Sequence, residues 1–91
     1  MAFSGGTMIA TILKIPQGAS AQADAHFARF IKETKGIANA YQLEGDNEVV
    51  MVTIWENEAA RDVYMKSSLK REVDQSYAGQ TRTVYKMRGH K

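Results

Sequence analysis

Residues 49–54 (VVMVTI) form an unbroken apolar and β-branched run that ends at Trp55. Periodicity alone does not separate a buried strand from a buried helix segment, but a run this short and this rich in β-branched residues favours a strand. A turn signal at residues 45–47 (GDN) precedes it. Asn57 and Glu58 follow it, as a helix N-cap and an acid suited to the positive end of the helix dipole. The run therefore predicts a strand that leads directly into a helix.

The rest of the chain supplies three more strands and two more helices by the same reasoning. The expected strands are residues 8–15, 37–44, 49–55 and 80–87, and the expected helices are residues 19–35, 57–66 and 69–77. Ser20 has the residue type of an N-cap, and Gly36 suits the C′ position. The order βαββαβ is the ferredoxin-like α+β pattern, in which right-handed crossovers place the helices on one face of an antiparallel sheet.

The expected strands at residues 8–15 and 49–55 are apolar on both faces, whereas the helices cover only one face of the sheet. An antiparallel sheet that is open to water on its second face should alternate to polar residues there. We therefore expect a second copy of the chain to cover that face, sheet against sheet, in a homodimer. Residues 8–88 are expected to form a single domain, between a flexible leader at residues 1–7 and a tail at residues 89–91.

Composition excludes several classes of function. The 91 residues include no cysteine, so disulfides and thiolate metal sites are impossible, and a reducing cytoplasm is the expected location. A net charge of +2 with interspersed acids and bases is far from a nucleic-acid-binding arm, and no apolar run is long enough to span a bilayer. Phosphate-binding glycine loops and nucleophile elbows are absent, and His26 and His90 form no metal-ligand spacing.

Residues 55–60 (WENEAA), together with the proline-ended strand at residues 8–18 and the Gly36-Ile37 pair, resemble the antibiotic biosynthesis monooxygenase-like family of dimeric α/β barrels. The resemblance covers residues 8–87. It implies a homodimer with a pocket between sheet and helices. Proteins of this kind include cofactor-free quinol-type oxygenases, haem-degrading enzymes and members with no known activity.

Two positions depart from the family pattern. Tyr64 stands where many members carry a histidine on the second helix, and Asp74 lies near the position where the haem-degrading branch needs an axial histidine. The resemblance therefore disfavours haem binding and degradation.

Eight residues are candidates for a site between sheet and helices. His26 is the candidate base, because histidine is the side chain that ordinarily titrates near neutral pH, and the Tyr64 hydroxyl can donate to a ligand oxygen. The candidate ligand-binding residues are aromatic or polar side chains on the expected elements: Trp55, Phe27, Phe30, Asn39, Tyr41 and Tyr85. Each of the eight also fits a plain packing role.

Arg82, Lys86 and Arg88 line one face of the last expected strand, and a solvated face is the first interpretation. An anion site or a salt-bridged dimer contact is the alternative.

The leading functional hypothesis is a cofactor-independent monooxygenase that acts on a flat phenolic or quinol-like molecule. By the resemblance, it would use dioxygen without metal or flavin. The alternative is a non-catalytic dimer that binds a small ligand or serves as an accessory protein. A haem-binding or haem-degrading protein comes third. The sequence leaves open whether the protein is an enzyme.

Overall fold

The computed structural model describes residues 7–18 and 20–89 of the chain. Most of the expected leader, the end of the expected tail with His90, and residue 19 lie outside the described residues. The elements follow in the order β1 (Ile9–Ile15), α1 (Ala21–Glu33), β2 (Ile37–Gly45), β3 (Glu48–Trp55), α2 (Glu58–Met65), α3 (Ser68–Ser76) and β4 (Thr81–Lys86). The strands form one antiparallel sheet in the order β2-β3-β1-β4, which confirms the ferredoxin-like α+β fold.

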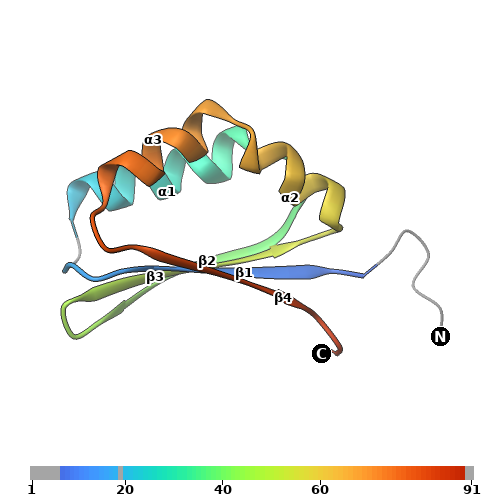
Figure 1. The fold of residues 1–91 in the computed structure, drawn as a ribbon, viewed down its shortest axis with the longest axis horizontal. Coiled ribbons are helices and arrows are strands. Elements are labelled where there is room, and N and C mark those ends of the chain that lie inside the picture. Colours follow the sequence, from blue (N-terminus) through green and yellow to red (C-terminus); the bar gives the residue numbers. More distant parts are fainter. Residues whose placement is uncertain (1–6, 19, 90–91) are drawn as a thin grey trace.

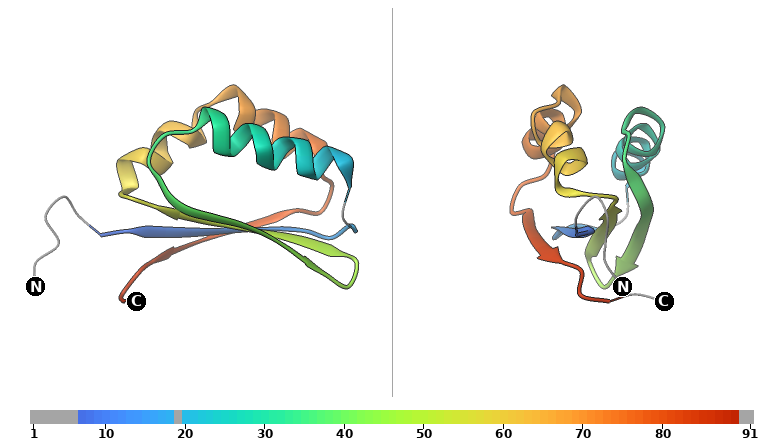
Figure 2. Two further views of the ribbon diagram at one scale, coloured as in Figure 1. Left: turned by 180° about the vertical axis from the view of Figure 1, so that it is seen from behind. Right: turned by 90° about the vertical axis from the view of Figure 1, so that its right-hand side faces the viewer.

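The three helices all lie on one face of this sheet (Figure 1). α1 forms one ridge, and α2 and α3 follow one another in a second ridge beside it (Figure 2). Within the described part of the chain, nothing covers the other face of the sheet. The fold thus has two layers, and any interior site must lie between the helices and the sheet.

Each of the three helices begins at a short polar residue whose side chain caps the helix N-terminus. Ser20 Oγ accepts from the backbone N–H of Ala23 at 3.0 Å, and Asn57 Oδ1 accepts from that of Ala60 at 2.9 Å. Ser67 caps α3 in the same way, which explains why α2 and α3 are separate helices in one ridge.

Gly36 has a different role from the expected C′ position. The C-cap of α1 is Thr34, so the helix ends earlier than predicted and Gly36 lies in the connection to β2. Its φ of +85° is in the left-handed region that glycine adopts without strain. A Cβ at this position would lie 2.4 Å from Cβ of Ala60, so glycine also lets the connection approach α2 closely.

The core is built from the side chains that the strands direct toward the helices. Ile15, Val49 and Trp55 are its most deeply buried large members, each about 1% exposed. The spacing of the apolar residues in the expected helix 57–66 predicts that Val63 points inward with Ala60 and Tyr64. This prediction is wrong, because the Val63 side chain is 73% exposed. The inward stripe of α2 runs through Ala60 and Tyr64, and Val63 lies roughly a quarter-turn away from its centre.

The uncovered face of the sheet carries apolar side chains in the centre and at the edges. Those of Val50, Val52 and Ile54 are half-buried on β3. Tyr41 on β2 and Tyr85 on β4 are each about half exposed on the same face. This apolar face agrees with the two-faced strands that the sequence predicts.

Candidate functional site

A small cavity of about 40 Å³ lies between the helices and the sheet; we call it the inner cavity. Its aromatic wall consists of Phe30, Trp55 and Tyr64, which we call the aromatic cluster. The Phe30 ring meets Trp55 edge to face at 5.7 Å and Tyr64 at 5.0 Å between ring centroids. The Trp55 and Tyr64 rings lie 5.6 Å apart and are tilted by 32°. Such arrangements are the favoured geometries of aromatic pairs.

The two polar groups of the aromatic cluster differ in their hydrogen bonding. Trp55 Nε1 donates a hydrogen bond to Thr11 Oγ1 at 3.1 Å, in the buried interior. Among the described residues, no hydrogen bond engages the Tyr64 hydroxyl, and the ring is only 9% exposed. Burial raises the pKa of Tyr64, with the charge of Arg82 opposing and that of Asp74 adding to the shift. Tyr64 is therefore a neutral phenol at physiological pH.

The polar wall of the inner cavity includes His26, which lies at the centre of a second group, the hydrogen-bonded cluster of His26, Arg29, Glu72 and Tyr77. The Nδ1 atom of His26 lies 2.5 Å from the Tyr77 hydroxyl, and its Nε2 atom lies 2.7 Å from Glu72 Oε2. Arg29 Nη1 donates to the same carboxylate oxygen at 2.7 Å. The cluster joins α1 to α3 across the roof of the inner cavity.

The partners of His26 determine which hydrogen bonds the neutral form of its ring can make. An ionised carboxylate only accepts, so Nε2 carries the hydrogen and donates to Glu72, and Nδ1 accepts from the Tyr77 hydroxyl. The hydrogen bond from His26, aided by the charge of Arg29, holds the pKa of Glu72 below its ordinary value, although desolvation acts to raise it. Burial raises the pKa of Tyr77, and the Glu72 charge adds to this. Both nitrogens of His26 are thus engaged.

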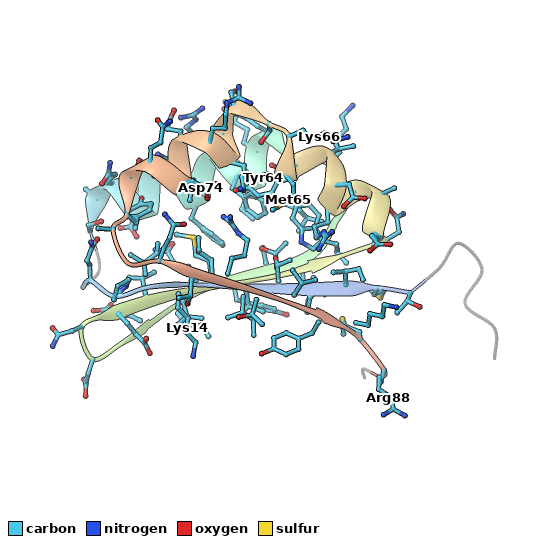
Figure 3. The ribbon with its side chains drawn as sticks, viewed as in Figure 1. Lys14, Tyr64, Met65, Lys66, Asp74 and Arg88 are labelled. Atoms are coloured by element: carbon cyan, nitrogen blue, oxygen red, sulfur yellow. The ribbon has the colours of Figure 1, made fainter. Side chains whose placement is uncertain are left out.

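Arg82 completes the polar wall, and here the solvated-face interpretation is wrong. Its side chain is 17% exposed because β4 directs residue 82 toward the helices, in register with Leu13 of β1. Arg82 Nη1 donates to Asp74 Oδ1 at 3.0 Å, and Lys70 also pairs with Asp74. Figure 3 shows Asp74 and Tyr64 on the helix side of the sheet and Lys14 on the opposite side. Lys86 and Arg88 are exposed, as expected.

Desolvation acts to raise the pKa of Asp74, but its hydrogen bonds with Lys70 and Arg82 outweigh burial and place the pKa below the ordinary value. Asp74 is therefore ionised at neutral pH and fixes the Arg82 guanidinium at the cavity. A cation in this position can stabilise a ligand oxyanion.

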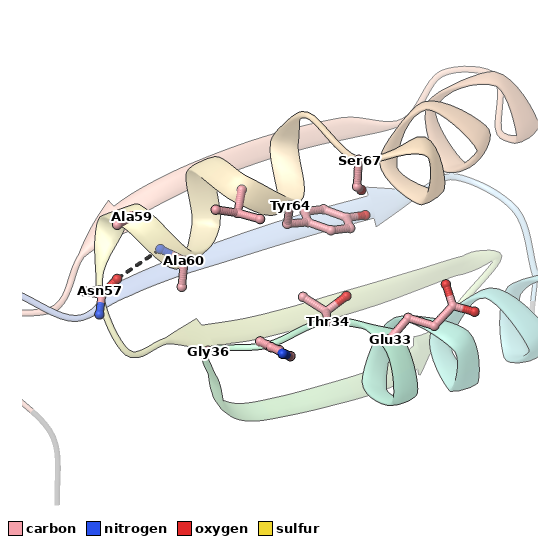
Figure 4. A pocket seen from close by; sticks show the side chains of 10 residues that line it. Glu33, Thr34, Gly36, Asn57, Ala59, Ala60, Tyr64 and Ser67 are labelled. Atoms are coloured by element: carbon pink, nitrogen blue, oxygen red, sulfur yellow. Dashed lines mark hydrogen bonds between the residues drawn. The ribbon is translucent and has the colours of Figure 1, made fainter.

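A larger hollow of about 480 Å³, the outer groove, lies between the end of α1 and α2 (Figure 4). Its apolar lining includes Ala59, Ala60 and Val63, and Thr34 and Ser67 supply hydroxyl groups. Tyr64 lines both the outer groove and the inner cavity.

The structure brings only some of the eight candidate residues together. His26, Phe30, Trp55 and Tyr64 line the inner cavity, from three different elements. Phe27 is half-buried on α1 and does not line it.

Asn39, Tyr41 and Tyr85 lie on the uncovered face of the sheet, in register with Ile54, Val52 and Ala10 respectively. These three side chains are exposed and do not line the inner cavity of their own chain.

The sequence does not indicate Glu72 and Tyr77 as site residues, and it offers Arg82 only through the alternative of an anion site on the last strand. The four-residue spacing of residues 69, 73 and 77 indicates that Tyr77 shares a helix face with Leu69 and Val73, but it does not indicate the hydrogen-bond partner of Tyr77, which lies 51 positions away in the chain. Alternation along β4 places Arg82 and Tyr85 on opposite faces of the sheet. Only the pairing of β4 with β1 shows which of the two faces the helices cover.

Residues 7–18 and 20–89 contain neither a cluster of metal ligands nor a helix that could cross a membrane. No three His, Asp or Glu side chains gather there in a way that could hold a metal ion. No helix in this part of the chain is long and apolar enough to cross a bilayer.

Among known proteins, only solved structures are similar to this chain, and they identify its fold. No family model matches the sequence, and no curated protein matches it. SnoaB, a cofactor-independent oxygenase from Streptomyces nogalater, superimposes with a TM-score of 0.72 at 16% identity, over 93% of this chain and 97% of that one. A protein of unknown function from Nitrosomonas europaea gives a TM-score of 0.72 at 10% identity, over 93% of each chain.

A proposed antibiotic biosynthesis monooxygenase from Bacillus cereus superimposes with a TM-score of 0.65 at 19% identity, over 94% of this chain and 98% of that one. At these identities the likeness concerns the fold and not the reaction. The element order, the sheet topology and these neighbours together confirm the resemblance found in the sequence: the chain has the antibiotic biosynthesis monooxygenase-like fold.

Proposed function

We propose that the protein binds a flat phenolic or quinol-like molecule between the sheet and the helices, with a ligand oxygen at the inner cavity, and oxidises it with dioxygen, without metal or flavin. The observation that carries the proposal is the composition of the cavity wall, which is aromatic on one side and cationic on the other. The fold is shared with a cofactor-independent oxygenase, which supports the same class of reaction.

The aromatic cluster supplies the dry part of such a site. Phe30, Trp55 and Tyr64 give the inner cavity an apolar aromatic wall, against which the hydroxylated edge of a ligand ring can lie. Exclusion of water strengthens every electrostatic interaction inside the cavity. The Tyr64 hydroxyl, which has no partner among the described residues, can donate to a ligand oxygen.

The cationic wall favours the reactive form of the ligand. A phenol reacts with dioxygen after it loses its proton, because the anion is the better one-electron donor. Arg82, fixed by Asp74, lowers the pKa of a bound phenol by stabilising its anion.

His26 is the proposed base for that proton. Glu72 holds the Nε2–H and so directs the basic Nδ1 lone pair toward Tyr77. A ligand hydroxyl must therefore displace the Tyr77 hydroxyl from Nδ1 before His26 can accept its proton.

The overall reaction is balanced for a simple quinol. 1,4-Dihydroxynaphthalene and one dioxygen give hydroxynaphthoquinone and one water, so one oxygen atom enters a C–H position of the ring and the other leaves as water. The substrate supplies all four electrons, and no external reductant is needed.

Oxygen uptake by metal-free protein, with chelator present, tests the proposed function. With dihydroxynaphthalene as substrate, Arg82→Gln should lower the enzymatic rate by about 10²-fold or more, as for the loss of one oxyanion donor. Arg88→Gln changes an exposed arginine of the same chain and should leave the rate unchanged. Uptake at the no-enzyme rate with wild-type protein would contradict catalysis.

One observation favours the second candidate function, a non-catalytic ligand-binding dimer. Both nitrogens of His26 already have partners, so the ligand-free chain presents no free base to the inner cavity. Ligand binding without oxygen uptake above the buffer rate is the outcome that this alternative predicts.

In either case we propose a homodimer formed through the uncovered face of the sheet. A stable interface of this kind buries roughly 1,200 Å² or more in total. Val52→Lys places a charge at the centre of that face, in register with Ile12 and Tyr41, and should give monomers in sedimentation experiments. Val63→Lys, at an exposed position on α2, is the matched control and should leave the dimer intact.

A further inference from the structure

We infer that the outer groove and the inner cavity are two parts of one ligand site, with the Tyr64 ring as a movable partition between them. The inference rests on the proposed function, since it says where the flat aromatic ligand of that function is held. It also names a binding surface, the wall of the outer groove, which none of the polar residues of the inner cavity wall lines apart from Tyr64.

The two volumes show that neither hollow is sufficient alone. The inner cavity of about 40 Å³ is far smaller than the roughly 150 Å³ of a cavity that accommodates benzene, so it has room for a ligand oxygen but not for a ring. The outer groove of about 480 Å³ is within the range of roughly 300 to 1,000 Å³ of small-molecule sites. A fused-ring ligand whose hydroxyl reaches Arg82 must therefore leave most of its body in the outer groove.

Tyr64 is the one residue that lines both hollows, among the residues that the structure describes. Its ring is held by aromatic contacts with Phe30 and Trp55, and no described hydrogen bond fixes its hydroxyl. An outward turn of this ring breaks no hydrogen bond, and the entering ligand ring can restore the lost contacts with Phe30 and Trp55. His26, whose two nitrogens are engaged, is held in place by comparison.

The outer groove has room for the displaced ring because small residues form its floor. Ala59 and Ala60 on α2 and Gly36 on the facing connection carry at most a methyl group (Figure 4). Thr34 and Ser67 place hydroxyl groups at the same hollow. The ligand class that fits is a fused-ring phenol, with one hydroxylated edge toward Arg82 and a second polar edge toward these hydroxyls.

The first test fills the outer groove and measures binding of 2-naphthol to the full chain by calorimetry. Ala59→Trp should weaken binding by about tenfold or more, because the ligand loses its place on the apolar wall. Ala28→Trp is the matched control, an exposed helix alanine that lines neither hollow, and should leave the affinity unchanged. Equal affinity of the two variants, or no binding of 2-naphthol by wild-type protein, would overturn the inference.

The second test examines the partition itself by stopped-flow measurement of 2-naphthol association. Tyr64→Ala removes the ring and should raise the association rate constant by about tenfold, whereas Tyr64→Phe keeps the ring and should leave it near the wild-type value. An equal association rate for wild type and Tyr64→Ala would overturn the moving partition. Neither readout needs turnover, so weaker binding by Ala59→Trp together with absent oxygen uptake would uphold this inference while contradicting the proposed catalysis.

Discussion

The aromatic cluster and the hydrogen-bonded cluster line the same interior but are held together by different forces. Phe30 and Tyr64 are held by shape and ring contacts, and the Tyr64 hydroxyl has no described partner. His26 and Tyr77 are held by directional hydrogen bonds that leave no ring nitrogen free. Apolar contacts tolerate rearrangement, whereas a buried polar group that loses its partner is costly. The aromatic side is therefore where the interior can open, and the polar side is where charge is kept in place.

The largest effect is expected from the centre of the aromatic cluster. Trp55→Ala should lower the free energy of unfolding by about 3 to 5 kcal/mol, the range for truncation of a buried aromatic residue. Urea denaturation at fixed protein concentration measures this. Trp55→Phe keeps a ring but loses the hydrogen bond to Thr11, and should fall between wild type and Trp55→Ala. A loss below about 1 kcal/mol for Trp55→Ala would mean that this cluster does not hold the core together.

A matched pair of hydroxyl deletions compares the two clusters directly. Tyr77→Phe leaves His26 Nδ1 buried without a donor and should cost about 1 to 3 kcal/mol of unfolding free energy. Tyr64→Phe removes a hydroxyl that has no described partner, and its effect should lie within about 0.5 kcal/mol of zero. Both are read from the same urea titration. Equal costs for the two substitutions would remove the distinction between the clusters.

The smallest effect is expected for Glu72, at the exposed edge of the hydrogen-bonded cluster, and it concerns how the melting temperature changes in acid. The pKa of Glu72 in the folded chain lies below its ordinary value of 4.5, so its ion pairs contribute stability above about pH 4.5. That contribution is lost as the pH falls through the lowered pKa. The melting temperature of Glu72→Gln should therefore lie below that of wild type at pH 6, and the difference should shrink toward pH 3.

Glu44→Gln is the control for the acid measurement, because Glu44 is exposed and belongs to none of the described ion pairs. Its melting temperature should follow that of wild type at every pH. A Glu72→Gln difference that grows as the pH falls would contradict the sign of the lowered pKa.

Local sequence signals predicted the secondary structure because each one acts over a few residues. Asn57 and Ser20 cap their helices as expected, and the apolar run before Trp55 is the buried strand β3. The same local reasoning was wrong for Val63, whose orientation depends on where α2 crosses the sheet.

The site was predicted less completely, since its polar half depends on contacts between distant elements. Trp55, Phe30 and Tyr64 could be placed inside from their spacing and apolar character. The partners of His26 are Glu72 in α3 and Tyr77 at the C-cap of that helix, and no local pattern in the sequence indicates that α1 lies beside α3. Arg82 was assigned to a solvated face because alternation gives two faces of a strand without showing which one is covered.

Oxidation of 1,4-dihydroxynaphthalene under ¹⁸O₂, by metal-free protein with chelator, tests the central claim most directly. Enzymatic monooxygenation predicts hydroxynaphthoquinone that carries one ¹⁸O atom, with no hydrogen peroxide. It also predicts that Arg82→Gln loses this product while Arg88→Gln retains it. Unlabelled naphthoquinone with hydrogen peroxide, formed at the rate of buffer alone, would contradict the account.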